Sequence, residues 1–289
     1  MRRERPKELA EAIRSHPRFV DAAGRFTADY LQWRVRLGVL NKVLSNLGRE
    51  RLLEHVCYLH FTRGEPGNVH GATFERLAEL SAARDQIGAR AMRTALRLAQ
   101  IAGLLLLARS RKDARLRIFE PTQALLAMVR ELYGLLLRAL DDLAPGLGLH
   151  AAVSDDPDFL AQNLARLGRA FLNAEFGSRE KPDVFNNLLR LEGGRAILTT
   201  AIKRHWRGED LPTSQEIARQ FYVSPSQIRL VLKHAESLGL IRTAARGRLL
   251  DAGPLREAYL DSLSRLLAVL AEHASALTPQ TFHKPAPDA

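Results

Sequence analysis

The chain lacks the features that disulfide cross-linking or membrane insertion would need. It contains a single cysteine, Cys57, so no disulfide can form within the chain. No apolar run reaches the ~18 residues of a membrane-spanning helix, and no apolar segment follows the basic start Met1–Lys7, as a secretory signal would require. Cys57 lies beside Val56 and Leu59 in an apolar helical pattern, which favours a buried thiol over a redox sensor. We therefore expect a cytoplasmic protein with no membrane partner.

Motifs of enzymes and metal sites are also missing. The sequence has no Gly-rich phosphate loop, no cysteine pair at zinc-binding spacing and no nucleophile motif. His55 and His60 would lie on different faces of a helix, which disfavours a shared metal ion. The acidic residues Asp155, Asp156 and Asp158 precede a helix, where the helix dipole accounts for them without a metal. We expect no enzymatic activity, no cofactor and no metal.

Acidic residues are too few to balance the basic ones. The chain has 43 Lys and Arg against 32 Asp and Glu, which gives a net charge of +11 and a pI near 10.3. This excess favours an anionic partner, either nucleic acid or a membrane surface. The basic residues recur on two helix-hairpin segments instead of forming one amphipathic anchor, which favours nucleic acid. Hydrophobic residues at 46% and charged residues at 26% are typical of a folded chain, here of about two domains.

The most informative stretch, Leu211–Ile241, has the pattern of a helix-turn-helix. Thr213 can cap a first helix with one apolar face. Ser224 can cap the second helix, with Pro225 at its first position and Gln227 completing a capping box. The inward stripe of the second helix is predicted to be Ile228, Val231, Leu232 and Ala235, and its outer surface Ser226, Gln227, Arg229, Leu230 and Lys233.

A basic hairpin is predicted directly after this pair of helices. Gly239 can end the second helix in a left-handed conformation, and residues 240–250 then read as two short strands around an Arg-rich tip. Helix, turn, helix and hairpin together make a winged helix. Residues 211–250 are called the second head below.

The second head resembles the DNA-binding head of the GntR-type bacterial regulators. In that family Leu-Pro-Ser/Thr opens the motif, Val-Ser begins the recognition helix, and Glu-x-x-Gly-Leu-Val/Ile ends it. The matching elements here are Leu211-Pro212-Thr213, Val223-Ser224 and Glu236-Ser237-Leu238-Gly239-Leu240-Ile241. The chain departs from the family in three ways: Leu230 replaces a usual acidic residue, the motif lies near the C-terminus, and no effector domain follows it. The resemblance implies DNA binding and does not support ligand sensing; a winged helix that contacts only protein is the alternative.

A second copy of this design lies upstream. Residues 95–105 superimpose on residues 231–241, with Gly103 matching Gly239 at an offset of 239 − 103 = 136. Phe74, Leu77 and Ala78 would supply the first helix of this copy, and Gly88 would cap the second. The predicted inward stripe is Met92, Ala95, Leu96 and Ala99, and the outward cations are Arg90, Arg93 and Arg97.

The wing of the upstream copy has its own resemblance. Residues 108–122 read as two strands around a basic tip, and a long helix starts at Thr122. This wing and exit resemble the MarR family, in which an Asp/Arg-rich tip, an apolar strand and a Thr-Pro-type turn precede a long helix. Residues 74–122 are called the first head. Its turn is longer than that of the second head, so an amphipathic helical pair with a solvated Arg face is the alternative.

Long amphipathic helices are expected to frame each head. We predict them at Thr27–Leu47, Arg49–Phe61, Thr122–Leu143, Asp158–Phe176, Gly193–Arg207 and Pro254–Leu277. The predicted fold is mainly α, with two winged-helix domains framed by these helices and small two-stranded β wings. The predicted divisions are a basic N-terminal arm with a short helix (1–26), the first winged-helix domain (27–143), a linker (144–154), the second winged-helix domain (155–277) and a disordered tail (278–289).

In the MarR family, helices outside the winged helix interlock two identical subunits. The duplicated plan therefore suggests that one chain contains both halves as a fused pseudo-dimer, with Thr27–Leu47 and Thr122–Leu143 packed against Asp158–Phe176 and Pro254–Leu277. A homodimer that carries four heads is the alternative. No residue pattern identifies a small-molecule effector.

These observations predict a sequence-specific regulator of transcription that binds double-stranded DNA. A recognition helix fits the major groove, where Arg can bind guanine and Gln can bind adenine. The residues expected to contact bases are Arg90, Arg93, Gln227 and Arg229, and those expected to contact the backbone are Arg97, Ser224, Ser226 and Lys233. Wing residues expected at the minor groove or phosphates are Arg109, Arg111, Lys112, Arg115, Arg246 and Arg248. A plasmid-type replication initiator and a protein-interaction adaptor are the alternatives.

Overall fold

A computed structural model describes residues 5–84, 87–110, 113–172, 184–244, 248–275 and 279–282. Over these residues the chain is mainly helical and has two small two-stranded antiparallel sheets, as predicted. The first half comprises α1 (Arg5–Ser15), α2 (Phe19–Arg36), η1 (Gly38–Lys42), α3 (Leu47–Phe61), α4 (Phe74–Arg84), α5 (Ala89–Ile101), β1 (Leu105–Arg109), β2 (Arg117–Pro121) and α6 (Gln123–Leu143).

The second half follows the same plan after one extra short helix. It comprises α7 (Leu149–Asp155), α8 (Pro157–Leu172), α9 (Val184–Leu189), α10 (Gly194–Arg207), α11 (Ser214–Phe221), α12 (Pro225–Ser237), β3 (Arg242–Thr243), β4 (Leu249–Asp251), α13 (Gly253–Ser275) and η3 (Pro279–Phe282). In order along the chain, α2, α3, α4, α5 and α6 thus correspond to α8, α10, α11, α12 and α13. Over the part of the chain that the structure describes, no helix combines the length and the apolar character needed to cross a membrane.

One framing helix differs from its prediction. The expected helix Thr27–Leu47 is wrong in its bounds, because α2 starts at Phe19 and ends at Arg36, and the 3-10 helix η1 follows. The buried side chain of Asn41 donates to the carbonyls of Arg34 (2.6 Å) and Gly38 (2.9 Å), so it satisfies carbonyls that a continuing α-helix would have paired.

The internal repeat extends to individual backbone hydrogen bonds. Gly103 and Gly239 both have a left-handed φ, of +72° and +69°, and both end a recognition helix. In the first head the N–H groups of Ala102, Gly103 and Leu104 donate to the carbonyls of Leu98, Gln100 and Ala99. In the second head Leu238, Gly239 and Leu240 donate to His234, Glu236 and Ala235. Each of these partners is displaced by the predicted 136 residues, so the two segments are structural copies.

The helix that leaves each wing is anchored in the same way in both halves. Thr122, the N-cap of α6, donates its N–H to the carbonyl of Leu104 (3.0 Å). In the second half Leu255 of α13 donates to the carbonyl of Leu240 (3.1 Å). Leu104 and Leu240 are equivalent positions in the repeat, so the same carbonyl accepts from the exit segment in both halves, although Thr122 precedes its helix and Leu255 is the third residue of α13.

The framing helices of the two halves are interlocked. Helix α2 of the first half packs against α10 of the second half, and α8 of the second half packs against α3 of the first. Since α8 corresponds to α2 and α3 to α10, these are the same pair of helices with the halves exchanged. Within each half, α2 packs on α6 and α8 packs on α13; between the halves, α6 also contacts α13. Buried apolar residues from both halves, including Leu137, Leu164, Ile197 and Leu267, belong to one continuous core. The heads are therefore not independent units on a flexible linker.

The segments at the predicted boundaries take part in this packing. Helix α1 lies along α13, and Arg14 forms ion pairs with Glu257 and Asp261. In the predicted linker 144–154, α7 begins at Leu149 and packs on α6 and α8.

Cys57 is fully buried in α3, as predicted, and burial raises the pKa of its thiol to about 12. The thiol therefore stays protonated and unreactive in the folded chain.

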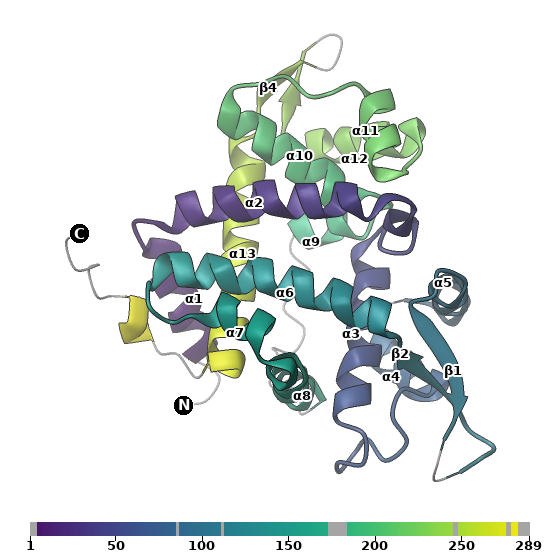
Figure 1. The fold of residues 1–289 in the computed structure, drawn as a ribbon. Helices are drawn as coiled ribbons and strands as arrows, with labels where there is room; N and C mark the ends of the chain where they lie inside the picture. The colour runs from purple at the N-terminus through teal and green to yellow at the C-terminus, as the bar shows by residue number, and fades with distance from the viewer. Residues whose placement is uncertain are drawn as a thin grey trace.

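In Figure 1 the first head lies at the lower right of this body of framing helices, and the second head lies above the body, with β4 near the horizontal middle of the view. Helices α11 and α12 are at the upper right, and α4 and α5 are at the lower right. The two wings extend toward opposite ends, β3 and β4 upward and the tip of β1 and β2 downward (Figure 1). The recognition helices therefore lie between the wings on one side of the molecule.

Candidate nucleic-acid interface

Polar side chains fix the two helix starts of the second head. The Thr213 hydroxyl accepts from the N–H of Glu216 (3.2 Å), while the Glu216 carboxylate accepts from the N–H of Thr213 (2.7 Å), which completes a capping box. The Thr213 hydroxyl also donates to the Glu216 carboxylate (2.8 Å), and this bond, with the one from the Thr213 N–H, lowers the pKa of Glu216. The Ser224 hydroxyl accepts from the N–H of Gln227 (3.2 Å), one half of the box predicted there, so the complete box lies one helix earlier. Tyr222, with φ +57°, makes the turn between the two helices.

The face of α12 that the sequence predicted to point outward does so. Ile228, Val231 and Ala235 are fully buried and Leu232 is half-buried, whereas the opposite side of the helix is accessible. The exposed side chains on that side are Ser224, Ser226, Arg229, Leu230 and Lys233, and Gln227 is half-buried. The helix thus presents two cations, two hydroxyls, an amide and one apolar side chain to its surroundings.

A carboxylate links this helix to its wing. Oε1 of Glu236 accepts from the backbone N–H of Thr243 (3.0 Å) and from its hydroxyl (2.8 Å). Arg242 of β3 lies 3.9 Å from Asp251 of β4, its antiparallel partner. Arg248, before β4, is exposed. Arg246 lies outside the described residues.

The first head has a more uniformly basic recognition helix. Gly88 is the N-cap of α5, as predicted, and all four residues of the predicted inward stripe are buried. Arg90, Arg93 and Arg97 are exposed, and α5 contains no acidic residue. The guanidinium of Arg93 lies 5.0 Å from the centre of the Phe74 ring, a cation–π contact that holds it against α4. This helix presents positive charge with few neutral hydrogen-bonding groups.

The wing of the first head has its cations near the tip. Strands β1 and β2 pair antiparallel, with Arg109 opposite Arg117 at the end of the ladder. In the turn Asp113 accepts from the N–H of Arg115 (2.9 Å). Arg109, Arg115 and Arg117 are all exposed. The predicted contacts Arg111 and Lys112 lie outside the described residues.

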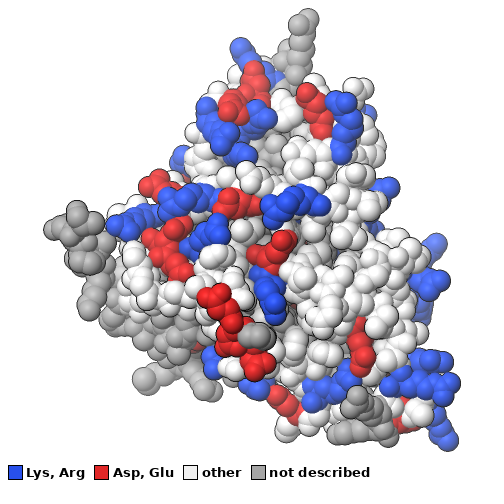
Figure 2. Space-filling model, in the orientation of Figure 1, with Lys and Arg blue, Asp and Glu red and all other residues white. Residues whose placement is uncertain are grey.

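Cations of the heads differ from those of the framing helices in their ion pairing. None of the exposed cations predicted to contact DNA that the structure describes forms an ion pair with a described carboxylate: Arg90, Arg93, Arg97, Arg109, Arg115, Arg229, Lys233 and Arg248. Many framing arginines do, for example Arg14, Arg25, Arg138, Arg169 and Arg256. Figure 2 shows blue side chains along the right-hand margin, where Figure 1 places α4, α5, α11 and α12. The contrast is not complete, since Arg76 of α4 and Arg242 of β3 are paired while Arg18 and Arg130 outside the heads are not, but the described cations predicted to contact DNA all lack a described carboxylate partner.

Sequence reasoning missed two members of this set. Arg117 of β2 and Arg219 of α11 are exposed and have no ion pair with a described carboxylate. Their positions carried a signal, since Arg117 precedes the buried Ile118 in a strand and Arg219 lies two residues after the buried Ile217 in a helix. Both patterns put the arginine on the accessible side of its element.

Two further findings bear on function. Among the described residues, no three or more His, Cys, Asp or Glu side chains are grouped so that they could hold a metal ion. Compared with models of known protein families, with curated proteins and with solved structures, the chain gives no match. Function must therefore be inferred from the geometry and charge of the two heads.

Proposed function

We propose that the chain is a sequence-specific double-stranded DNA-binding regulator of transcription that uses two winged helices. The observation that carries the proposal is that both repeat-related recognition helices, α5 and α12, expose cations that have no ion pair with a described carboxylate. Surface arginines and lysines without carboxylate partners can neutralise phosphates without first breaking an ion pair. The resemblance of the second head to GntR-type heads and of the first wing to the MarR family supports the same function.

The two helices would read DNA in different ways. In the major groove, which is about 12 Å wide, Arg can donate two hydrogen bonds to guanine and Gln can bind adenine through both its amide atoms. We assign base contacts to Gln227 and Arg229 on α12 and to Arg90 and Arg93 on α5.

The interlocked framing helices support a pseudo-dimer within one chain. The exchanged pairs, α2 with α10 and α8 with α3, resemble the way identical subunits exchange helices in a dimer. Both recognition helices lie on one side of the body with the wings toward opposite ends (Figure 1). One chain would therefore present two heads to one face of a duplex without a second copy.

Titration of the purified chain with random and selected duplexes at several salt concentrations tests this proposal. If six to ten phosphates are contacted, affinity should fall by about 10³–10⁵ between 50 and 200 mM salt. The double variant Arg93→Ala/Arg229→Ala should bind weakly. The matched control Arg169→Ala/Arg256→Ala, which removes two ion-paired cations of the framing helices, should bind like the parent.

Binding that is absent, or insensitive to salt, would instead favour an adaptor that contacts protein. Mapping of bound sites across the genome separates the remaining alternatives. A transcription regulator should occupy promoters, whereas a replication initiator should occupy repeated sites at an origin.

A further inference from the structure

A cavity of about 390 Å³ lies among the framing helices, outside both heads. Its walls come from both halves of the repeat, mainly α2, α3 and α6 from the first half and α9, α10 and α13 from the second. Its volume falls within the range of about 300–1,000 Å³ that is usual for small-molecule sites. Such sites are commonly found between the helices of bundles and at the junctions of structural units.

Leucine side chains and aromatic rings form the apolar wall, and the hydroxyls of the tyrosines among them are already engaged. The Tyr259 hydroxyl lies 2.8 Å from the hydroxyl of Thr27, and Tyr58 and Tyr133 hydrogen-bond to each other. The Tyr30 hydroxyl accepts from Arg34 (3.3 Å). The rings therefore offer apolar faces to the cavity, and few of their hydroxyls are free to bind a ligand.

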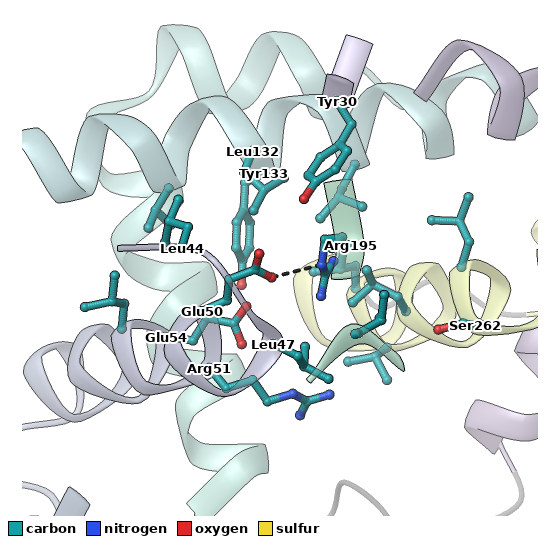
Figure 3. Close-up of a pocket in the computed structure, with 18 of the residues that line it drawn as sticks. Tyr30, Leu44, Leu47, Glu50, Arg51, Glu54, Leu132, Tyr133, Arg195 and Ser262 are labelled. Atoms are coloured by element: carbon teal, nitrogen blue, oxygen red, sulfur yellow. Dashed lines mark ion pairs between the residues drawn. The ribbon is translucent and has the colours of Figure 1, made fainter. Parts of the chain in front are cut away.

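The charged group at the cavity has more guanidinium than carboxylate. Oε1 of Glu50 accepts from Nη1 of Arg34 (2.8 Å), and Oε2 lies 2.9 Å from Nε of Arg195 (Figure 3). Arg34 is 2% exposed and comes from α2, whereas Arg195 lines the cavity and comes from α10. With Arg51, Glu54 and Arg265 at the same wall, the group holds four guanidiniums and two carboxylates, so positive charge is in excess.

Arg195 is the cation placed to use that charge. Its side chain is 27% exposed, and its terminal nitrogens, Nη1 and Nη2, donate to no described protein acceptor. Burial opposes ionisation of Arg195, but the combined attraction of nearby acidic groups, chiefly Glu50 with Tyr30 and Glu54, outweighs it and raises the pKa above its usual value. A planar guanidinium with both terminal nitrogens free matches the geometry of a carboxylate.

We propose that this cavity binds a small amphiphilic monocarboxylate, whose carboxylate pairs with Arg195 and whose apolar body lies against the tyrosine rings. A purely structural role explains only part of the cluster. Glu50 is already neutralised by the buried Arg34, and the second carboxylate, Glu54, can balance only one of the three guanidiniums of Arg51, Arg195 and Arg265. A ligand carboxylate would balance part of the remaining charge, and its apolar body would fill a cavity that water solvates poorly.

Ligand in this cavity would also affect the heads. Helix α3 lines the cavity and packs on α4, α5 and β2 of the first head, while α10 lines it from the other half and packs on α12 and β4. The contacts of a ligand between α3 and α10 depend on how these two helices are placed relative to each other. The ligand therefore stabilises one placement of the helices, and with it one spacing of the heads. This regulatory consequence rests on the proposed DNA-binding function, whereas ligand binding itself does not.

Calorimetric titration of the full chain tests the site with three probes. 1-Naphthoate and decanoate both carry one carboxylate, on an aromatic and an alkyl body, and 1-naphthylmethanol is a neutral analogue of the first. We expect at least one carboxylate to bind with one site per chain and naphthylmethanol to bind weakly. Which of the two carboxylates binds more tightly identifies the body that the cavity prefers. Absence of binding by both carboxylates, or equal binding of 1-naphthoate and its neutral analogue, would overturn the proposal.

Two variants locate the site. Arg195→Gln should weaken carboxylate binding by roughly 10- to 100-fold, since a charge-assisted hydrogen bond is lost. Arg204→Gln, on the same helix but paired with Glu209 outside the cavity, should leave it unchanged. Leu266→Trp keeps the ion pairs and introduces a bulky ring at the lining, so it should also block binding even if Arg195→Gln does not fold. Unchanged affinity in folded Arg195→Gln, or in Leu266→Trp, would contradict the assignment.

A parallel measurement of DNA affinity with and without the bound carboxylate tests the regulatory part. A change in DNA affinity that Arg195→Gln abolishes supports it, and unchanged DNA affinity at saturating ligand refutes it. If the chain binds no DNA at all, the proposed function fails, while the calorimetric titration still decides the ligand site.

Discussion

Glu50 links three elements of the interior through its two oxygens. It comes from α3, and the guanidiniums that it holds come from α2 and from α10 of the other half. Arg34 is nearly inaccessible, with 2% of its side chain exposed, and its second terminal nitrogen donates to the carbonyl of Leu44 (3.0 Å). A charge in such a place depends on its counter-ion.

Removal of the Glu50 carboxylate should therefore destabilise the fold strongly. Glu50→Gln leaves Arg34 charged and buried without a counter-ion, and we expect the free energy of unfolding to fall by about 3–5 kcal/mol. Arg195→Gln should cost much less, because Glu50 keeps its bond to Arg34. Urea denaturation followed by circular dichroism measures both. Similar losses in the two variants would show that Arg34 does not depend on Glu50.

The arginines of the second head should separate base reading from phosphate binding. Arg229 lies on the outer face of α12, and Arg248 lies at the wing. Arg229→Ala should reduce discrimination at one base pair by about 1–3 kcal/mol, whereas Arg248→Ala should weaken binding to all sequences alike. Competition between duplexes that differ at single positions distinguishes the two effects. Equal losses with no change of preference in either variant would contradict the assignment.

At the scale of elements, the repeat predicts matched costs at two glycines. Gly103 and Gly239 have a left-handed φ, and a Cβ added at either would meet no atom within 4 Å. Gly103→Ala and Gly239→Ala should each lower the free energy of unfolding by about 1–2 kcal/mol, from backbone strain alone. Gly24→Ala, in the interior of α2 with ordinary φ and similar space, should instead stabilise the chain by up to about 1 kcal/mol. Thermal or urea unfolding of the three variants tests this pattern, and a loss at Gly24 equal to the other two would argue against strain as the cause.

Elements whose ends depend on local chemistry were predictable from the sequence. The start of α12 at Ser224-Pro225 and its end before Gly239 follow from residues within one turn of the helix. The end of α2 could not be predicted in this way, because apolar residues continue beyond Arg36. The helix ends there because the Asn41 side chain binds the carbonyls of Arg34 and Gly38, and these bonds exist only in the folded chain. Helical periodicity alone does not show that a polar side chain within the expected helix will bind backbone carbonyls and so end the helix early.

At the scale of the whole molecule, residue patterns predicted which helices frame the heads but only part of how they pair. As predicted, α6 and α2 contact α13 of the other half, whereas α2 packs mainly on α10 of that half and α8 packs on α3. The exchange of α2 with α10 and of α8 with α3 depends on which surfaces fit together, and periodicity shows only that each helix has an apolar face. The cavity was missed for the same reason. Glu50 and Arg195 lie far apart in the sequence, and neither belongs to a motif, so only the packed structure brings them together. The accessible cations of the heads lie within the motifs themselves, which is why they could be predicted.

The asymmetry of the two heads leads to a prediction about the DNA site. On α5 the outward positions are Arg90, Arg93 and Arg97, while the equivalent positions on α12 are Ser226, Arg229 and Lys233. If one chain supplies both heads, its site should consist of two unlike half-sites with centres about 10 bp apart, one helical turn, so that both lie on one face of the duplex. Selection from a random duplex library, followed by measurement of the mass of the complex, should give an asymmetric site bound by one chain.

Rearranged sites show whether both heads engage together. Insertion of half a helical turn, about 5 bp, moves one half-site to the opposite face and should reduce affinity to that of a single head. Insertion of a whole turn keeps the faces aligned, so it separates the effect of rotation from that of distance. A palindrome built from either half-site should bind one chain less tightly than the selected site does, because one head then meets the wrong bases. If palindromes instead bind best and carry two chains, the interlocked halves act as one reading unit in a homodimer, and the single-chain pseudo-dimer is refuted.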